Sequence, residues 1–300
     1  MPAALAVVAA LVNAVTSVLQ RLGVESAPPS AALRLGLLAH AVRRPVWLVG
    51  FALMLVEFGL QAIALRFGQL SLVQPLLTTE LLFLVAILGT WFHFSIGWRE
   101  WAGAAAVVAG LGGFFATARP SGGHHLATAS TWVVASVVTV ACIAGFVVAG
   151  TRGPRWWRAA SFGAATALTA AYSASLTKAT TTYVSEGWGH VFTHAQPYLL
   201  GVAGVATVFL LQNALHAGPI AASRTTLITL NPLASIGLGV GLFGDRLASG
   251  GTATAAEAVS LAVLVAGAAA LARSPLVSGT PGDLASEDEL LGTARRRVSP

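Results

Sequence analysis

The chain has 300 residues, of which 56% are hydrophobic and only 9% are charged, and its net charge is +6. A soluble domain carries about 25% charged residues, so this composition excludes a protein with a polar surface all round and predicts one embedded in lipid. The single cysteine, Cys142, excludes an intrachain disulfide and a cysteine-rich metal site. The arginines lie between apolar runs rather than in one basic patch, which argues against nucleic acid as a partner.

Nine segments are long and apolar enough to cross a bilayer, which takes about 20 residues. In chain order they cover approximately residues 2–20, 45–66, 70–91, 98–118, 130–150, 157–178, 195–215, 219–243 and 254–272. Residues 30–42 are shorter and carry Arg34 and His40, which favours an interfacial or re-entrant helix but leaves a tenth span open. The sequence therefore predicts an all-α membrane protein with nine to ten transmembrane helices in residues 1–275, followed by a disordered cytoplasmic tail at 276–300.

Arginine placement predicts the orientation of the nine spans, because loops rich in basic residues stay in the cytoplasm. Twelve arginines fall on one side: Arg21, Arg34, Arg43, Arg44, Arg99, Arg152, Arg155, Arg158, Arg273, Arg295, Arg296 and Arg297. The other side receives Arg66, Arg119 and Arg246. We expect the N-terminus outside and the C-terminus in the cytoplasm. Arginine outnumbers lysine heavily and alanine and glycine are abundant, which indicates a bacterial plasma membrane.

The two halves of the chain resemble each other. With a shift of 150 residues, seven of 26 positions in the longest matching segment are identical. Shorter matches, at a slightly larger shift, follow in the same order along the chain. The matching segments are 64–89 with 214–239, 14–21 with 171–178, and 107–110 with 264–267.

These matches divide the chain into two repeats. Repeat one covers about residues 2–120 and repeat two about 157–275, with the span at 130–150 as a linking helix. The matching units lie five spans apart, an odd number, so they cross the membrane in opposite directions. Inverted repeats of this kind are the architecture of many secondary transporters, whose substrate site lies near the midplane between the halves.

The stretch "SLVQPLLTTELLFLVAILGTWFHFSIGWREWAGAAAVVAGLGGFF" resembles the repeat unit of the drug/metabolite transporter (EamA-like) superfamily. In that unit a helix with an early proline, here Pro75, precedes a short loop and a helix with a W-x-G pattern, here Trp101 and Gly103. The spacing of "VEFGLQAIALRFGQLSLVQPL" is similar to the NIPA-type magnesium transporter branch. The resemblance covers about residues 1 to 275. It implies a role for Glu57, although the family's acidic loop residue is absent from "GTWFHFS" and is kept only as Asp245 in "FGDRL".

Two glutamates fall near the centres of consecutive predicted spans, where a charge costs about 2.5–3.5 kcal/mol on insertion scales. Glu57 and Glu80 would meet if these spans form a hairpin. Gln61 shares the helical face of Glu57, and Thr79 lies beside Glu80. Such hard oxygen and amide groups suit a cation, a proton relay or a polar solute. The pair is therefore a candidate metal site, with a proton or Mg²⁺ as the transported ion and no resident cofactor.

The second half supplies further polar candidates within its spans, namely Gln212, Asn213, Arg224, Thr229 and Asn231. Arg224 has three interpretations: it reaches the cytoplasmic interface, binds an anionic group, or balances Glu80. Alternatively, each glutamate simply pairs with Arg224 or with a helix hydroxyl, and the glutamates then stabilise the packing of the helices rather than bind a ligand. On the first span Asn13 and Thr16 share a face, which either lines a pathway or packs against another helix.

Three further features have competing interpretations. Lys178 aligns with Arg21 near a helix end, which predicts an interfacial anchor rather than a ligand. Pro232 lies inside its span and removes a backbone hydrogen bond, which predicts either a carbonyl exposed to substrate or a packing kink. Gly237 and Gly241 form a G-x-x-x-G pattern, which is typical of helix packing.

The sequence thus predicts a secondary transporter of a small solute or cation, working by alternating access around Glu57 and Glu80. A NIPA-like magnesium transporter is the first alternative, and a non-transporting membrane scaffold is the second. No enzyme is expected: "SLTK" at 175–178 lacks the partner motifs of S-x-x-K enzymes, and the chain contains neither H-E-x-x-H nor a Walker loop. The expected partners are the lipid bilayer and the substrate, and a homodimer is compatible with this interpretation.

Overall fold

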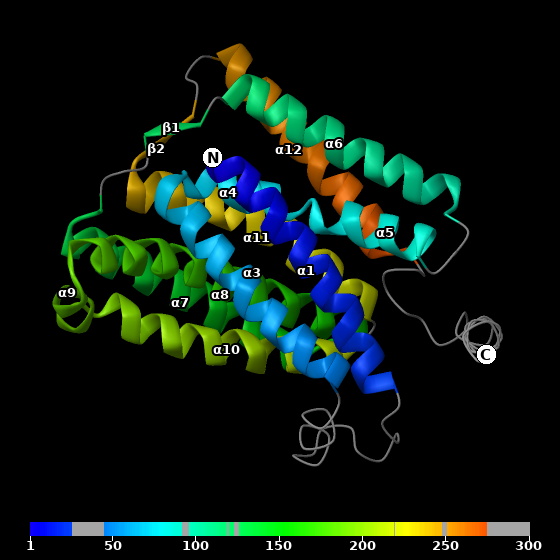
Figure 1. Ribbon diagram of the computed structural model, residues 1–300, viewed down its shortest axis with the longest axis horizontal. Helices are drawn as coiled ribbons and strands as arrows, with labels where there is room; N and C mark the ends of the chain where they lie inside the picture. Colours follow the sequence, from blue (N-terminus) through cyan, green and yellow to red (C-terminus); the bar gives the residue numbers. More distant parts are fainter. Residues whose placement is uncertain are drawn as a thin grey trace.

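The computed structural model describes residues 1–25, 45–91, 96–118, 120–122, 126–218, 220–247 and 251–274. This part of the chain is helical apart from one short pair of strands (Figure 1). The first half of the chain contains α1 (Pro2–Glu25), α3 (Pro45–Phe67), α4 (Leu70–Leu77), α5 (Glu80–Thr90) and α6 (Trp98–Ala118), followed by β1 (Ser121–Gly122) and α7 (Ala129–Gly150). The second half contains α8 (Arg155–Glu186), α9 (Trp188–Thr193), α10 (Gln196–Ala217), α11 (Ile220–Phe243), β2 (Asp245–Arg246) and α12 (Gly251–Ala272).

The structure is that of an all-α, multi-pass membrane protein. Within the described residues, eight helical stretches are long and apolar enough to cross a bilayer. They correspond to every predicted span except 157–178, which lies inside the longer and less apolar helix α8. The expected helix at 30–42 and the expected tail at 276–300 lie outside the described residues.

Large apolar side chains cover the outside of the bundle. On α7, for example, Val133 and Val137 are both 62% exposed, and on α10 Val205 is 73% exposed. A surface of this kind would be unstable in water over so large an area. It matches the acyl chains of a bilayer, which confirms the expectation from composition.

The helix α8 lies at the centre of the second half, packed against α7, α10 and α11 (Figure 1). Its buried positions are mostly alanine, glycine, serine and threonine. These small side chains let neighbouring backbones approach closely: at Gly163 a Cβ atom would lie 2.5 Å from the carbonyl oxygen of Ser223. Most of its hydroxyls bond to carbonyls of the preceding turn, as Thr169 does to Ala165 at 2.8 Å, so α8 pairs most of its polar side chains within the helix itself.

The predicted span 70–91 is not one continuous helix. The helix α4 ends at Leu77 and α5 begins at Glu80, with Thr78 and Thr79 between them. Both threonine amides bond to carbonyls three residues back, Thr78 to Pro75 at 3.2 Å and Thr79 to Leu76 at 3.0 Å, and both hydroxyls bond to the same carbonyls. The regular helical ladder is therefore interrupted at the centre of the span.

The interruption lies beside Pro75, whereas the helix α11 continues through Pro232 from Ile220 to Phe243. A continuous helix is compatible with both interpretations of Pro232. The expectation for Gly237 and Gly241 is corrected: they do not pack inside the described part of the chain, because both are exposed and a Cβ atom on either would have no neighbour within 4 Å.

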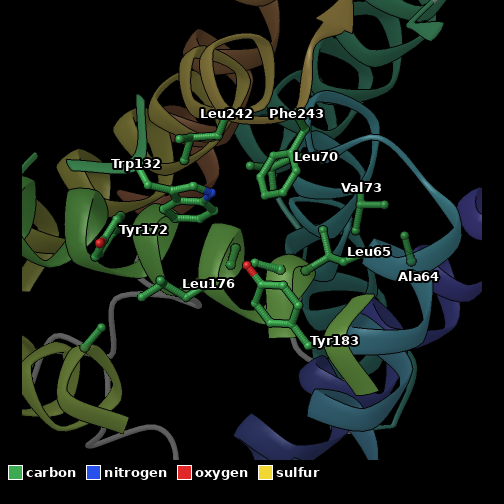
Figure 2. Packing of buried hydrophobic residues seen from close by; sticks show 14 of the residues in the cluster. Ala64, Leu65, Leu70, Val73, Trp132, Tyr172, Leu176, Tyr183, Leu242 and Phe243 are labelled. Atoms are coloured by element: carbon green, nitrogen blue, oxygen red, sulfur yellow. The ribbon is translucent and has the colours of Figure 1, made fainter. Parts of the chain in front are cut away.

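A buried apolar cluster joins the two halves (Figure 2). It brings Leu65 and Leu70 of the first half together with Leu176 and Phe243 of the second. Trp132 of α7 closes one side, with its ring 6.1 Å from that of Phe243 and nearly perpendicular to it. The cluster fixes the end of α11 against the turn between α3 and α4.

The helices α6 and α12 form a tight antiparallel pair. Added Cβ atoms show how closely the two backbones approach: one on Gly110 would lie 2.4 Å from the amide nitrogen of Leu264, and one on Gly267 would lie 2.7 Å from that of Val107. Under the match of 107–110 with 264–267, Gly110 corresponds to Gly267 and Val107 to Leu264. The two contacts are therefore reciprocal.

The strands β1 and β2 lie at one end of the bundle, beside the N-terminus (Figure 1). They pair antiparallel, with Gly122 opposite Asp245 and Ser121 opposite Arg246. The side-chain amide of Gln69 adds a bond to the carbonyl of Gly122 at 3.2 Å. This small pair of strands thereby fixes the start of α4 and the end of α11 at the same end of the molecule.

Candidate functional site

The structure brings the two intramembrane glutamates near each other. Glu57 lies on α3 and Glu80 on the first turn of α5, and the charge of Glu80 acts on the carboxylate of Glu57. The side-chain amide of Asn13, on α1, donates a hydrogen bond to Glu80 Oε2. All three residues lie in the middle of their spans, and α1 packs against both α3 and α5.

The position of Glu80 follows from the interruption in its span. Glu80 is the first residue of α5, directly after the two threonines. The amides of Leu81, Leu82 and Phe83 in this turn already bond to the carbonyls of Thr78 and Thr79, so the donor that Glu80 receives comes from Asn13.

Arg224 belongs to the surroundings of this group, because its positive charge acts on the carboxylate of Glu80. It lies near the start of α11, in the other half of the chain. Because Arg224 is also exposed, the structure is compatible both with the interpretation in which it balances Glu80 and with the one in which it reaches the membrane interface. Gln61 is partly buried one turn along α3 from Glu57.

Several other predicted site residues form side-chain hydrogen bonds to the backbone one turn earlier rather than to the glutamates. The hydroxyl of Thr79 bonds to the carbonyl of Leu76 at 2.7 Å and that of Thr229 to Thr225 at 2.9 Å. Gln212 is exposed on α10, and the neighbouring Asn213 donates to the carbonyl of Phe209 at 2.8 Å. In the described part of the chain no hydrogen bond draws Gln212 or Asn213 into the glutamate group.

Several buried polar atoms on α4 and α11 have no hydrogen-bond partner in the structure. The amide nitrogen of Gln74 and the hydroxyl of Ser235 are among them, as is the amide oxygen of Asn231. Buried polar groups are nearly always bonded to protein or to water, so these atoms mark where water or a polar solute is needed. Asn231 is a site residue that the sequence predicts, whereas Gln74 and Ser235 are not.

A second polar group, which sequence reasoning missed, lies at the end of the bundle near the N-terminus. The ammonium of Lys178 donates to the carbonyl oxygen of Gly68 at 2.8 Å and lies 3.8 Å from Asp245 Oδ1. The other carboxylate oxygen of Asp245 accepts from the amide of Ser71 at 2.9 Å and from its hydroxyl at 2.7 Å. We call these four residues the Lys178–Asp245 network.

This network is almost completely buried and it joins the two halves. The side chains of Lys178 and Asp245 are 5% and 0% exposed. Lys178 comes from α8, Asp245 follows α11, and Gly68 and Ser71 belong to the turn from α3 to α4 in the first half. The expectation that Lys178 is an interfacial anchor is wrong, because its ammonium is enclosed by protein and lies 4.7 Å from the centre of the Phe243 ring.

Glu257 is a further buried carboxylate that sequence reasoning did not single out. It lies on α12, is 6% exposed, and one of its oxygens has no hydrogen-bond partner in the structure. Within the described residues there is no group of three or more histidine, cysteine, aspartate or glutamate side chains that could hold a metal ion. A cation at Glu57 and Glu80 would therefore be completed by amide, hydroxyl, carbonyl or water oxygens.

Comparison with known proteins identifies one distant relative. The chain is 24% identical over 248 residues to an uncharacterised protein of Corynebacterium glutamicum, an alignment that spans 82% of this chain and 86% of that protein. No protein-family model matches the chain. No solved structure matches it either.

Proposed function

We propose that the chain is a secondary transporter of the drug/metabolite transporter type, which moves a small solute or cation by alternating access. One observation carries the proposal: two carboxylates, Glu57 and Glu80, lie within electrostatic range at the middle of a membrane bundle, directly beside the turn that interrupts the helix of Glu80. Ionisable residues at this depth mark substrate or ion pathways, and broken spans are a feature of transporter binding sites.

The contacts of the two halves support an inverted repeat. A reciprocal antiparallel contact between α6 and α12 is what a two-fold axis between the repeats would produce. A second pair of contacts fits the same relation. A Cβ atom on Gly68 would meet Pro2 at 2.8 Å, and one on Gly218 would meet Ala159 at 3.2 Å.

These two contacts are equivalent under the sequence matches. Gly68 corresponds to Gly218 in the longest match, and extending the match of 14–21 with 171–178 backwards places Pro2 on Ala159. The glycine that ends the second helix of each repeat therefore packs against the start of its first helix. This supports nine spans, with α8 as the partner of α1.

The mechanism follows from the cost of a buried charge. A carboxylate held at the midplane resists movement of its helix into lipid or into a closed protein interior. Binding a proton, a cation or a cationic solute removes that charge, so the halves can rearrange around the occupied site. The hydrogen bond from Asn13 and the positive charge of Arg224 favour the charged form of Glu80, against the cost of its burial.

The Lys178–Asp245 network closes one end of the interface between the halves in this proposal. The arginine bias assigns that end to the outside. Opening the path to the outside would require Lys178 to leave the Gly68 carbonyl, or Asp245 to leave Ser71. The network would then act as the outer gate, and the glutamates as the site that it encloses.

Ligand-dependent unfolding tests the proposal even though the substrate is unidentified. The purified full-length protein is heated with a panel of divalent metals and of cationic and polar metabolites, and every compound that raises its melting temperature is then tested for uptake into proteoliposomes. We expect both the stabilisation and the uptake to be lost in Glu80→Gln and reduced in Glu57→Gln. The matched control is Glu186→Gln, which changes an exposed carboxylate at the end of α8.

The same experiment separates the alternatives. Oxygen-rich side chains and the absence of soft ligands favour a hard cation, so magnesium is the second candidate substrate. Uptake of millimolar Mg²⁺, followed with an entrapped fluorescent indicator and abolished in Glu57→Gln, would identify the magnesium pathway. Wild-type behaviour of both glutamate variants, together with loss of function on changing the cytoplasmic arginines, would instead indicate a scaffold.

A further inference from the structure

A surface groove lies at the turn between α7 and α8, away from the glutamates and from the Lys178–Asp245 network. Its volume is about 610 Å³, which suits a lipid headgroup rather than a whole lipid. The lining residues are Val148, Ala149, Arg152, Gly153, Pro154, Trp156 and Trp157. Because α7 is a candidate span that ends at Gly150, the groove lies where the membrane surface meets water.

One wall of the groove is apolar and continues onto the lipid-facing side of α7. Val148 is 64% exposed there. The rings of Trp156 and Trp157 lie 5.8 Å apart, nearly perpendicular, and both are largely exposed. Tryptophan is enriched at this depth of a membrane, because its ring is apolar and its N–H group is polar.

The other side of the groove carries one arginine, and a second lies just outside it. Arg152 lines the groove, whereas Arg155 adjoins the lining residues Pro154 and Trp156, and both arginines are exposed. The segment 151–158 contains no acidic residue. Arg158 is already engaged, since its Nε donates to the carbonyl of Gly150 at 3.3 Å, which leaves Arg152 and Arg155 to bind a ligand.

We propose that this groove binds the phosphate of an anionic phospholipid, with Arg152 and Arg155 on the phosphate and the acyl chains along Val148 and the two tryptophans. Arginine matches phosphate with paired N–H donors. The apolar wall extends toward the acyl region, which favours a lipid over a soluble anion. The arginine bias places this turn on the cytoplasmic side, where anionic lipids attract basic groups.

Native mass spectrometry of the full-length protein tests the site. The protein in detergent is mixed with phosphatidylglycerol or with phosphatidylcholine, and the retained lipid is counted. We expect preferential retention of phosphatidylglycerol, weakened by about fivefold for each arginine removed in Arg152→Gln/Arg155→Gln. The double variant Arg152→Lys/Arg155→Lys keeps the charge and is expected to retain an intermediate amount.

A matched control removes the same two charges elsewhere. Arg66→Gln/Arg246→Gln changes two exposed arginines at the opposite end of the bundle, and we expect it to retain phosphatidylglycerol as the wild type does. Equal loss in both double variants would show only a general charge effect and would overturn the site. Equal retention of the two lipids by the wild type would do the same.

A soluble competitor distinguishes the source of the phosphate. Glycerol 3-phosphate at millimolar concentration carries the same charged group without acyl chains, and we expect it not to displace phosphatidylglycerol. Displacement at that concentration would show that the groove takes a free phosphate compound, and the lipid assignment would then be wrong.

Discussion

Buried charge determines the chemistry of this protein at the scale of single residues. Lys178 is the only lysine in the chain, and its ammonium is enclosed together with the carboxylate of Asp245. Burial of such a pair stabilises a fold only weakly, but removal of one partner leaves an unpaired charge inside the protein. The pair is thus better suited to holding one arrangement of the halves than to adding stability.

Lys178→Met is expected to lower the free energy of unfolding by about 3–5 kcal/mol, because Asp245 then remains buried without its cation. The free energy of unfolding of the double variant Lys178→Met/Asp245→Asn is expected to fall clearly less than that of Lys178→Met alone. Titration with SDS in mixed micelles measures the free energy of unfolding of both variants. The control, Arg66→Met, changes an exposed cation at the end of α3 and should alter stability by no more than about 0.5 kcal/mol. Equal losses in the single and double variants would show that Lys178 and Asp245 are not energetically coupled.

Asn13→Ala removes the amide that donates to Glu80, and we expect it to destabilise the protein by about 1–3 kcal/mol at neutral pH. The loss should shrink as the pH falls, because a protonated Glu80 no longer needs a donor, and it should nearly vanish in Asn13→Ala/Glu80→Gln. Melting temperatures across a pH series measure the effect. The control is Ser17→Ala, at an exposed position on the same helix. A loss of stability in Asn13→Ala that does not depend on pH would show that Asn13 does not act through the charge of Glu80.

Sequence reasoning located the two glutamates but not the Lys178–Asp245 network. Glu57 and Glu80 could be found because a charge inside an apolar run is conspicuous in one dimension. The contact of Lys178 with Gly68 joins positions 110 residues apart, and Ser71 and Asp245 are 174 apart. No local pattern reports such distances. The alignment of Lys178 with Arg21 is a local pattern of this kind, and it misplaces the lysine at the membrane interface.

Backbone interruptions matter at the scale of helices. Hydropathy treats residues 70–90 as one span, and eight of the nine segments that it predicted are candidate spans in the described part of the chain. It could not show that two threonine hydroxyls bond to carbonyls three residues back and end α4 there. Hydropathy also underestimated the length of α8, which continues beyond the predicted span 157–178 to Glu186. The alanines, serines and threonines of α8 suit close packing against other helices rather than contact with lipid.

Pro75→Ala supplies an amide that can bond to the carbonyl of Ser71, and proline inside a helix costs about 3 kcal/mol. We expect this variant to be more stable than the wild type but to transport several-fold more slowly, because the span becomes more regular beside Glu80. Pro232→Ala is the matched control: it should also stabilise the protein, yet leave uptake unchanged, since α11 is already continuous. Proteoliposome uptake and SDS titration measure the two effects, and similar uptake by both variants would contradict a role for the break.

Gly110→Ala and Gly267→Ala each place a methyl group against the backbone of the partner helix, at 2.4 Å and 2.7 Å from an amide nitrogen. We expect each to cost about 1–3 kcal/mol and the two losses to be similar, as reciprocal contacts require. Gly112→Ala is the control on α6, since its Cβ atom would meet nothing within 4 Å. A large loss at only one of the two glycines would argue against a two-fold relation between α6 and α12.

At the scale of the whole molecule, the arginine bias and the fold agree on which helix ends lie together. The start of α1, the turn from α3 to α4 and the two strands gather at one end of the bundle (Figure 1). All of these are assigned to the outside by the same nine-span topology. The agreement depends on α8 crossing the membrane. Without that crossing the chain would have eight spans, and its N-terminus and C-terminus would lie on the same side of the membrane.

Cysteine labelling tests that crossing. In a Cys142→Ala background, which removes the single native cysteine, Thr151→Cys and Ser185→Cys place a thiol at exposed positions before and at the end of α8. We expect a membrane-impermeant maleimide to label Ser185→Cys on intact cells, and Thr151→Cys only after permeabilisation. Labelling of both on intact cells would show that α8 does not cross, and the reverse pattern would invert the topology.

The two halves carry different charged residues at matching positions, and this restricts how the chain could be built from a duplicated half. At a shift of 150 residues, Glu57 and Glu80 fall on Thr207 and Leu230, while Asp245 falls on Ser95. The first half thus contains both glutamates, and the second half contains the charged residues of the Lys178–Asp245 network. A chain made of two copies of the first half would have four intramembrane glutamates and no lysine, so neither half can replace the other.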